Sequence, residues 1–360
     1  MMKKLMMLIP ACALLAVAAL AAGGIEDPLA SLSYLTGTFT TTVHAQVDQR
    51  LDASDQELLA SAASGTLTAE GTDQWVETRL KEGDILQGST GTSVLLLAGG
   101  GQVTYTTGAV VDVTSGKEVA SGTALQADHR YMVAEDTTAM FIVTTKTAVV
   151  QYQGGGSIAA SSTVDYNAMA AALKQLNLFR GTLTGYGEGY DLELAPTRLQ
   201  ALIMFIRVLG EEDAALAWSG TTPFTDIAKG SQAEKYVGYA YEKGYTNGFS
   251  ATQFKPGNAV NAYQYTEFIL RAMGYSSSSN TNLADTLNRA RIAGVLTAGE
   301  AAALQTGKFL RADLVYVSYY ALEATMPDGA QTLGQVLISK GIFTEEAWAG
   351  AQSLVKSQRM

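Results

Sequence analysis

The fold of the C-terminal half is decided by the stretch RLQALIMFIRVLG at Arg198–Gly210, which recurs as AYQYTEFILRAMG at Ala262–Gly274. The two stretches agree in register, since Arg271 stands 64 positions after Arg207 (271 − 207 = 64). A third and poorer copy, RADLVYVSYYALEAT, occupies Arg311–Thr325. Apolar residues recur in these stretches at the spacing of a helix. Self-similarity at a fixed period is typical of stacked units that cannot bury their apolar faces alone.

Each copy is predicted to contain two helices joined by a loop. In the second copy, FTD at 224–226 opens the unit, and Asp226 is expected to cap the first helix. Gly244 and Gly248 end that helix, because glycine allows the positive φ of a tight turn. The loop FKP at 254–256 then leads into the second helix.

The other two copies repeat parts of this plan. The segment LFRG at 178–181 stands over YTNG at 245–248. In the third copy, ARIAG at 290–294 repeats the A-x-x-x-G spacing of AYEKG at 240–244. The plan is therefore clear in the first two copies and partial in the third.

This pattern resembles the S-layer homology module of Gram-positive surface proteins, whose hallmarks are an F-x-D opening, an A-x-x-x-G-x-x-x-G turn, an F-x-P loop and a T-R-A-E helix start. The resemblance covers about residues 167–355, in copies at about 168–212, 220–275 and 283–355. It implies an all-α domain with pseudo-three-fold symmetry. It also implies grooves between modules that bind pyruvylated secondary cell-wall polysaccharide without a covalent link.

The helix starts carry the residues that the resemblance assigns to the polysaccharide. T-R-A-E appears as TRLQ at 197–200, NAYQ at 261–264 and LRAD at 310–313. We therefore expect ligand contacts from Arg198, Gln200, Arg311 and Asp313, and from Tyr245 after the turn glycine. An arginine at a helix start adds its donors to the unpaired backbone amides there, which suits a carboxylate such as a pyruvyl ketal. The middle copy has Ala262 in place of arginine, so its groove is expected to be weak or silent.

The N-terminus predicts export. Lys3 and Lys4 precede an apolar run from Leu5 to Ala22, the pattern of a secretory signal peptide over residues 1–22. The run is long enough for a retained membrane anchor as an alternative. Cleavage would leave no stable membrane insertion. It would also remove Cys12, the only cysteine, so the mature chain could form no disulfide or thiolate metal site.

Composition limits the partners. The chain has 360 residues and a formal net charge of −10. Such acidity argues against nucleic acid as a partner, because phosphate backbones attract basic surfaces. An anionic wall polymer faces the same repulsion. Its binding must therefore depend on local arginines within a groove, because salt screens the global field beyond about 10 Å.

Upstream of the repeats the chain changes character. Apolar residues every four positions predict a helical segment within 30–66. Short β-branched runs separated by glycines predict a β-rich domain over 67–153, as a small sandwich, roll or barrel. The Gly/Ser-rich stretch 154–166 is predicted to be a flexible linker. The fold class is therefore α+β, with a small N-terminal β-rich domain and a C-terminal all-α domain.

Candidate catalytic groups are few. His44 and His129 are the only histidines, and neither stands in a metal-ligand spacing. The pair Glu135-Asp136 stays open as glycosidase carboxylates, because sequence does not give their separation in space. We expect no catalytic residue, cofactor or metal.

The leading function is non-catalytic attachment of a secreted protein to the cell wall of a Gram-positive-type bacterium. The expected partners are secondary cell-wall polysaccharide with peptidoglycan, and other S-layer subunits. A wall-polymer hydrolase or other exoenzyme targeted by the repeats is the main alternative. Repeats that serve only as a structural spacer are a third.

Overall fold

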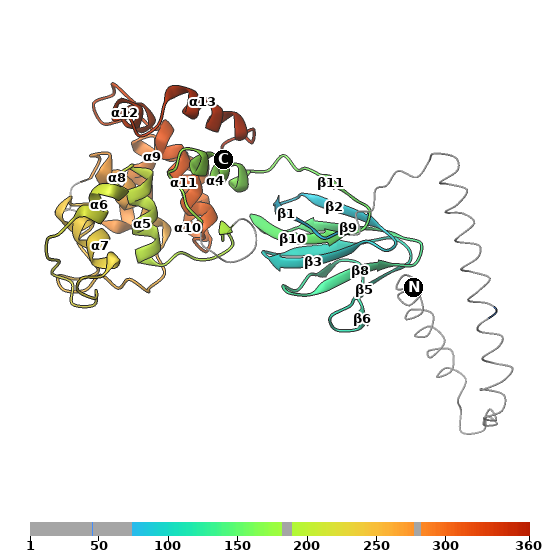
Figure 1. Ribbon diagram of the computed structural model, residues 1–360. Helices are drawn as coiled ribbons and strands as arrows, with labels where there is room; N and C mark the ends of the chain where they lie inside the picture. Colours follow the sequence, from blue (N-terminus) through green and yellow to red (C-terminus); the bar gives the residue numbers. More distant parts are fainter. Residues whose placement is uncertain (1–44, 46–73, 182–188, 277–281) are drawn as a thin grey trace. The chain divides into compact units, whose positions relative to one another are not determined.

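The computed structural model describes residues 74–181, 189–276 and 282–360, together with the single residue Ala45. The predicted signal peptide, Cys12, His44 and, apart from Ala45, the predicted helical segment lie outside the described residues. Residues 71–360 form one compact unit, in which strands come first and helices follow (Figure 1). This order confirms the predicted α+β organisation. No helix in the described ranges is long and apolar enough to cross a membrane.

The β-rich region consists of two antiparallel sheets. The six-stranded sheet has the order β1-β10-β3-β8-β5-β6, and the five-stranded sheet has the order β11-β2-β9-β4-β7. The strands are β1 Val76–Lys81, β2 Ile85–Ser89, β3 Ser93–Ala98, β4 Gly101–Thr104, β5 Ala109–Asp112, β6 Lys117–Glu118, β7 Thr123–Ala124, β8 Arg130–Ala134, β9 Thr138–Val143, β10 Thr147–Gln153 and β11 Gly156–Ala159.

Alternating side chains of both sheets share one core. In β3, Val94 and Leu96 are buried while Leu95 between them is half-buried, which is the period of two that a strand imposes. Phe141 of β9 and Leu86 of β2 contribute to the same core from the other sheet. The pairing of Leu86 with Phe141 fixes the register between these two strands.

The segment predicted as a flexible linker is partly a strand. Residues Gly156–Ala159 form β11, which pairs with β2 along Ile85–Gly88. Thr163 and Ser161 donate hydrogen bonds from their hydroxyls to the carbonyl of Glu82, and Asp165 caps the helix that follows. The prediction of a linker was wrong here because composition does not reveal that a sheet edge is available for pairing.

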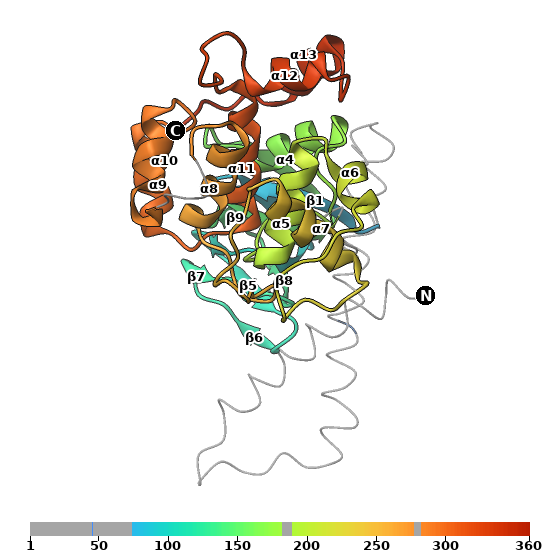
Figure 2. The same ribbon diagram turned by 90° about the vertical axis from the view of Figure 1, so that its left-hand side faces the viewer.

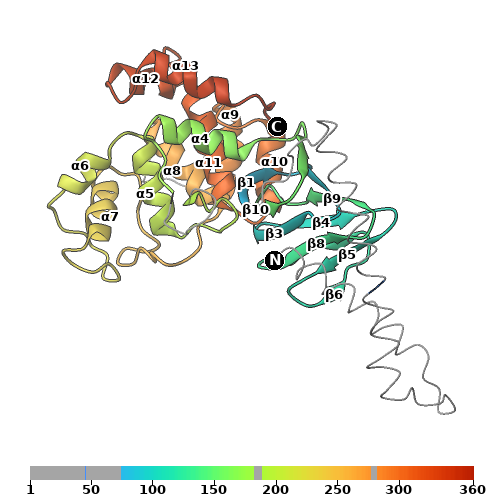
Figure 3. The ribbon, with the colours of Figure 1, turned by 45° about the vertical axis from the view of Figure 1, so that its right-hand side comes forward.

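The helical region has one continuous core. Its elements are α4 Tyr166–Gln175, α5 Arg198–Val208, α6 Glu212–Ala217, α7 Gln232–Glu242, α8 Ala262–Ala272, η3 Leu283–Asp285, α9 Thr286–Ile292, α10 Ala298–Thr306, α11 Arg311–Glu323, α12 Leu333–Ser339 and α13 Glu345–Leu354. The three quoted stretches of sequence correspond to α5, α8 and α11, which contact one another in all three pairings (Figures 2 and 3).

Buried aromatic side chains join these three helices. The rings of Phe205 in α5 and Phe268 in α8 lie 5.6 Å apart, and the hydroxyl of Tyr265 in α8 lies 2.6 Å from Ser318 Oγ in α11. The backbone N–H of Arg198 at the start of α5 donates to Asn258, and that of Arg311 at the start of α11 donates to Leu194, so each of these two helix starts lies against a loop of another repeat.

Candidate ligand grooves between the repeats

Arg198 is held at the start of α5 by a loop of the next repeat. Thr197 and Gln200 form a capping box that fixes the helix start. The backbone N–H of Arg198 donates to the carbonyl of Asn258 at 2.8 Å, and its Nε donates to the carbonyl of Phe254 at 2.9 Å. The guanidinium carbon lies 4.9 Å over the Phe254 ring. Arg198 is only 4 % exposed, so its guanidinium is fixed in direction before any ligand binds.

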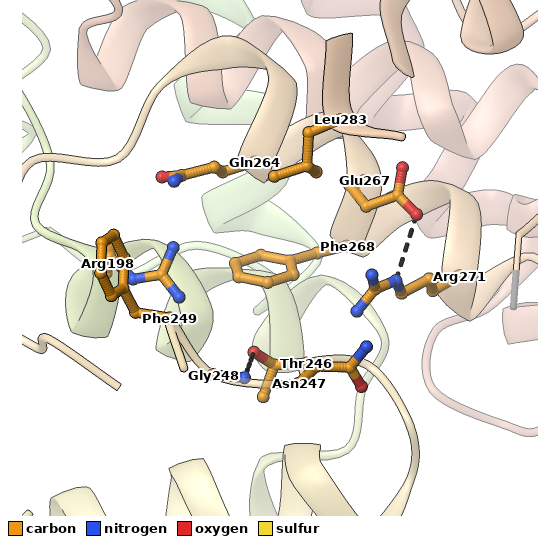
Figure 4. A pocket seen from close by; sticks show the side chains of 10 residues that line it. All are labelled: Arg198, Thr246, Asn247, Gly248, Phe249, Gln264, Glu267, Phe268, Arg271 and Leu283. Carbon is orange, nitrogen blue, oxygen red and sulfur yellow. Dashed lines mark hydrogen bonds and ion pairs between the residues drawn. The ribbon is translucent and has the colours of Figure 1, made fainter. Parts of the chain in front are cut away.

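A groove of about 190 Å³ opens beside this guanidinium (Figure 4). We call it the Arg198 groove. One wall is the turn that follows α7, and the other is the exposed side of α8. It is lined by Arg198, Thr246, Asn247, Gly248, Phe249, Gln264, Glu267, Phe268, Arg271 and Leu283. In Figure 4 the guanidinium groups of Arg198 and Arg271 lie on opposite sides of the Phe268 ring.

The charge of the Arg198 groove is positive. Glu267 is 2 % exposed and accepts hydrogen bonds from Arg271 and Arg289, while the hydroxyl of Thr286 donates to it as well. The lining of the groove therefore carries the guanidinium groups of Arg198 and Arg271 and the one carboxylate of Glu267. Burial lowers the pKa of Arg198, and the nearby Asp226 carboxylate opposes that shift. An arginine stays cationic at neutral pH even so.

Asp226 positions the loop rather than a helix end. Its carboxylate accepts from the backbone N–H of Phe254 at 2.9 Å and of Lys255 at 2.7 Å. Ser231 caps α7 instead. The prediction that Asp226 caps this helix was therefore wrong, since the carboxylate reaches across to the F-x-P loop. Through Phe254, it supports the placement of Arg198.

A second groove, of about 200 Å³, lies beside Arg311 at the start of α11. We call it the Arg311 groove. It is lined by Phe179, Arg180, Gly181, Pro196, Gln200, Ile203, Met204, Arg207, Arg311 and Leu314. The Nε of Arg311 donates to the carbonyl of Tyr190 at 3.1 Å. The lining therefore carries three arginines, of which Arg207 and Arg180 contact Glu212. The charges of Asp191 and Glu193 act on Arg311.

The two grooves are built from equivalent positions. Gln200, Met204 and Arg207 of the Arg311 groove stand 64 residues before Gln264, Phe268 and Arg271 of the Arg198 groove (264 − 200 = 64). The turn segments 179–181 and 246–248 also correspond, at a spacing of 67 residues (246 − 179 = 67). Each groove is therefore lined by the turn and second helix of one repeat and by the leading arginine of another, that is, the arginine at the start of its second helix.

The structure distributes the five predicted ligand residues over several environments. Arg198 lines one groove, and Arg311 and Gln200 line the other. Asp313 is 3 % exposed and binds the backbone N–H of Leu310 and the ammonium of Lys146. Tyr245 lies just outside the Arg198 groove lining, and its hydroxyl donates to Glu211. Burial, followed by the charge of Glu211, raises the pKa of Tyr245 well above its usual range.

Sequence reasoning missed Arg207 and Arg271 as groove residues. Both line grooves at equivalent positions. Arg207 and Arg271 agree in register between the first two copies of the repeat. This agreement was the available signal for a shared role.

The described ranges contain no cluster of metal-ligating side chains. No set of three or more His, Cys, Asp and Glu side chains there could hold a metal ion. Glu135 and Asp136 are adjacent in an exposed turn between β8 and β9. Within the part that the structure describes, the two grooves are therefore the strongest candidates for ligand binding.

Comparison with known proteins supports the resemblance. Residues 223–261 match the family model described as S-layer homology domain, which confirms the resemblance for this part of the chain. A cell surface protein of Thermoanaerobacter kivui is 29% identical over 182 residues, or 49% of this chain and 23% of that protein.

Two further relatives match a shorter stretch. A surface layer protein of Brevibacillus choshinensis is 30% identical over 112 residues, and a middle cell wall protein of Brevibacillus brevis is 29% identical over 111 residues. Each of these two matches covers 31% of this chain and 10% of the relative. The chain therefore spans less than a quarter of the length of the relatives it matches.

Proposed function

We propose that this chain, which carries an S-layer homology domain, is a non-catalytic cell-surface protein that attaches to the cell wall without a covalent bond. The proposed ligand is pyruvylated secondary cell-wall polysaccharide in the peptidoglycan-containing wall. Relatives named as cell surface, surface layer and cell wall proteins support this location. Other S-layer subunits are proposed as further partners.

The observation that carries the proposal is the repetition of an arginine-lined groove. The lining of the Arg198 groove carries two arginines and one glutamate, and that of the Arg311 groove carries three arginines, in a chain whose formal net charge is −10. A local excess of guanidinium groups in an acidic protein suits a ligand that carries isolated carboxylates. Bidentate arginine contacts bind carboxylates more strongly and more directionally than a single ammonium does.

The Arg198 groove also offers groups for the sugar that carries the carboxylate. Gln264 Oε1 is buried, and none of the described residues donates a hydrogen bond to it. This oxygen could therefore accept a hydrogen bond from a sugar hydroxyl. Phe249 is 55 % exposed at the groove, with the ammonium of Lys255 over one face at 3.6 Å. An aromatic ring at the mouth of a polar groove suits stacking against the apolar face of a sugar.

We infer pseudo-three-fold symmetry for the helical region. The mutual contacts of α5, α8 and α11 and the equivalence of the two grooves support it. In such an arrangement, the start of the second helix of each repeat would line a groove shared with one neighbouring repeat. The turn of the same repeat would line a groove shared with the other neighbour.

The absence of catalysis is part of the proposal. His129 Nδ1 lies 2.7 Å from Asp112 Oδ2, and the hydroxyl of Ser115 donates to the same carboxylate rather than to the imidazole. Asp112 therefore holds both groups, and the histidine does not activate this serine. The arrangement supports a structural role for the β-rich region.

Sedimentation of the secreted chain with purified cell wall tests the proposal. We expect the chain to sediment with wall that carries the pyruvylated polysaccharide and to stay in solution with wall from which the polysaccharide has been extracted. Equal sedimentation with both walls would contradict the proposed ligand. Release of soluble wall fragments by the chain would contradict the proposed lack of catalysis.

A further inference from the structure

The third repeat forms a position equivalent to the two grooves, and the chain itself fills it. The turn residues Val295–Thr297 follow Gly294 as Tyr245–Asn247 follow Gly244. On α11, Tyr316 and Tyr320 stand 49 residues after Glu267 and Arg271 (320 − 271 = 49). We call this place the third position.

Residues near the C-terminal end of the sequence lie in the third position. Arg359 Nη2 donates to the carbonyl of Val295 at 2.8 Å, and its guanidinium carbon lies 4.4 Å over the ring of Tyr320. The backbone N–H of Met360 donates to the hydroxyl of Tyr316 at 3.1 Å. The hydroxyl of Thr297 donates to the carbonyl of Met360 at 2.8 Å.

Arg359 takes the place of an arginine that the third repeat lacks. Arg271 contacts the carbonyl of Tyr245, the first residue after the turn glycine, and Arg359 contacts the corresponding carbonyl of Val295. Arg207 and Arg271 occupy this helix position in the first two repeats, whereas the third has Tyr320. A guanidinium from a distant segment therefore sits against the turn, stacked on the residue that replaced the arginine.

The charge of the third position is the reverse of that in the two grooves. Glu300 is fully buried, and its carboxylate accepts from Arg359 Nε and, at 2.9 Å, from Arg359 Nη2. The hydroxyl of Tyr316 and the backbone N–H of Thr297 donate to the same carboxylate. The middle copy has Ala262 at the helix-start position that holds arginine in the other two copies. The fixed charge here is therefore a carboxylate that needs a cation.

We propose that the third position is a receptor for an arginine side chain, that its occupant is this chain's own segment Lys356–Met360, and that it does not bind anionic polymer. Two nitrogens of a guanidinium meet both oxygens of Glu300 while its flat face lies on Tyr320. A lysine ammonium can neutralise the charge of Glu300. It cannot form the paired hydrogen bonds of a planar guanidinium or lie flat on the ring of Tyr320. The contacts stand independently of the proposed wall ligand.

If the third position holds an arginine of the chain, only the Arg198 groove and the Arg311 groove are available to an anionic ligand, and that consequence alone rests on the proposed function. The test therefore uses no wall polymer in its main arms.

Hydrogen exchange of the backbone amides of 295–301 tests the proposal in the full chain. Arg359→Ala should speed their exchange by about tenfold or more, and Arg359→Lys should give an intermediate rate. The matched control is Arg291→Ala, at an exposed arginine outside the third position, which should exchange as wild type does. Equal rates in wild type and Arg359→Ala would overturn the proposal.

A second pair of variants separates charge pairing from misfolding. Arg359→Ala leaves Glu300 buried without its cation, so its melting temperature should fall. Adding Glu300→Gln removes that unpaired charge and should recover part of the loss. If Arg359→Ala melts as wild type does, or if the double variant melts lower than Arg359→Ala, the proposed pairing is wrong.

A peptide arm identifies the ligand class. In a chain ending at Val355, a synthetic peptide with the sequence of residues 356–360 should restore slow exchange in 295–301, and the same peptide with glutamine at the arginine should not. Protection of this segment by a pyruvylated polysaccharide fragment instead of the arginine peptide would overturn the proposal. Failure of the wall-binding experiment would leave these results unchanged, so the two proposals can fail separately.

Discussion

The Nε of Arg198 donates to the carbonyl oxygen of Phe254 at 2.9 Å, and the guanidinium lies over the ring of the same residue. This contact ties the start of α5 in one repeat to the loop of the next. Arg311 makes the equivalent contact with Tyr190, which stands 64 residues before Phe254 (254 − 190 = 64). The leading arginine therefore joins two repeats and lines a groove at the same time.

The first prediction concerns affinity for the wall. Arg198→Ala should weaken binding about ten- to a hundred-fold, because a charge-assisted contact contributes roughly 1.5–3 kcal/mol. Sedimentation with purified wall over a range of protein concentrations measures this change. Circular dichroism should show unchanged helical content, and Arg291→Ala should bind as wild type does. If Arg198→Ala binds the wall with the affinity of wild type, Arg198 does not contribute to the binding site.

The second prediction concerns the turn that forms one wall of the Arg198 groove. Gly248 has a φ of +81°, and an added Cβ would lie 2.2 Å from Cε1 of Phe224. Gly248→Ala should therefore lower the melting temperature and weaken wall binding together, since Phe224 and the turn must move. Gly257→Ala is the matched control, because a Cβ there meets open space. If Gly248→Ala and Gly257→Ala have the same melting temperature, the contact with Phe224 does not require glycine at position 248.

A third prediction concerns the packing of α7. A Cβ on Gly238 would lie 2.1 Å from Cη2 of Trp218, so Gly238→Ala should displace the indole from the helix. We expect a red-shifted tryptophan emission and a lower melting temperature. Gly299→Ala in α10, where the nearest atom lies 3.6 Å away, should change neither. Unchanged emission in Gly238→Ala would show that Trp218 does not pack there.

The fourth prediction concerns acid stability. Burial raises the pKa of the Asp226 carboxyl, but backbone hydrogen bonds from Phe254 and Lys255 outweigh it, so the pKa lies below its usual value. A lowered pKa in the folded state stabilises the protein above the unfolded pKa of about 3.9, and this contribution is lost as pH falls through the lower folded pKa. Urea unfolding should show Asp226→Asn less stable than wild type above about pH 5, with the difference shrinking below about pH 4.

A difference between wild type and Asp226→Asn that stays constant down to pH 2 would contradict the role given to these hydrogen bonds.

Much of the fold follows from local patterns. The β-branched runs around Leu86, Val94 and Phe141 coincide with strands, and the quoted repeat stretches coincide with α5, α8 and α11. The edge strand β11 could not be predicted from its glycine and serine composition, because it forms through pairing with β2. The two-residue strands β6 and β7 likewise depend on the neighbouring strands that they meet.

The grooves were only half predictable. The helix-start motif identified Arg198 and Arg311, but not which turn each arginine faces, since that depends on the order in which the repeats pack. Asp313 was predicted as a ligand residue, and in the structure its carboxylate contacts Lys146 of the β-rich region. Such a contact between segments 167 residues apart has no signature in the local sequence.

Isothermal titration of the secreted chain with a purified, pyruvylated polysaccharide fragment measures whether the two grooves bind the proposed ligand. We predict two binding sites per chain, reduced to one in Arg198→Ala and in Arg311→Ala, and no heat of binding with the same fragment after removal of pyruvate. Equal binding of the pyruvate-free fragment, or a stoichiometry that neither substitution changes, would contradict the account.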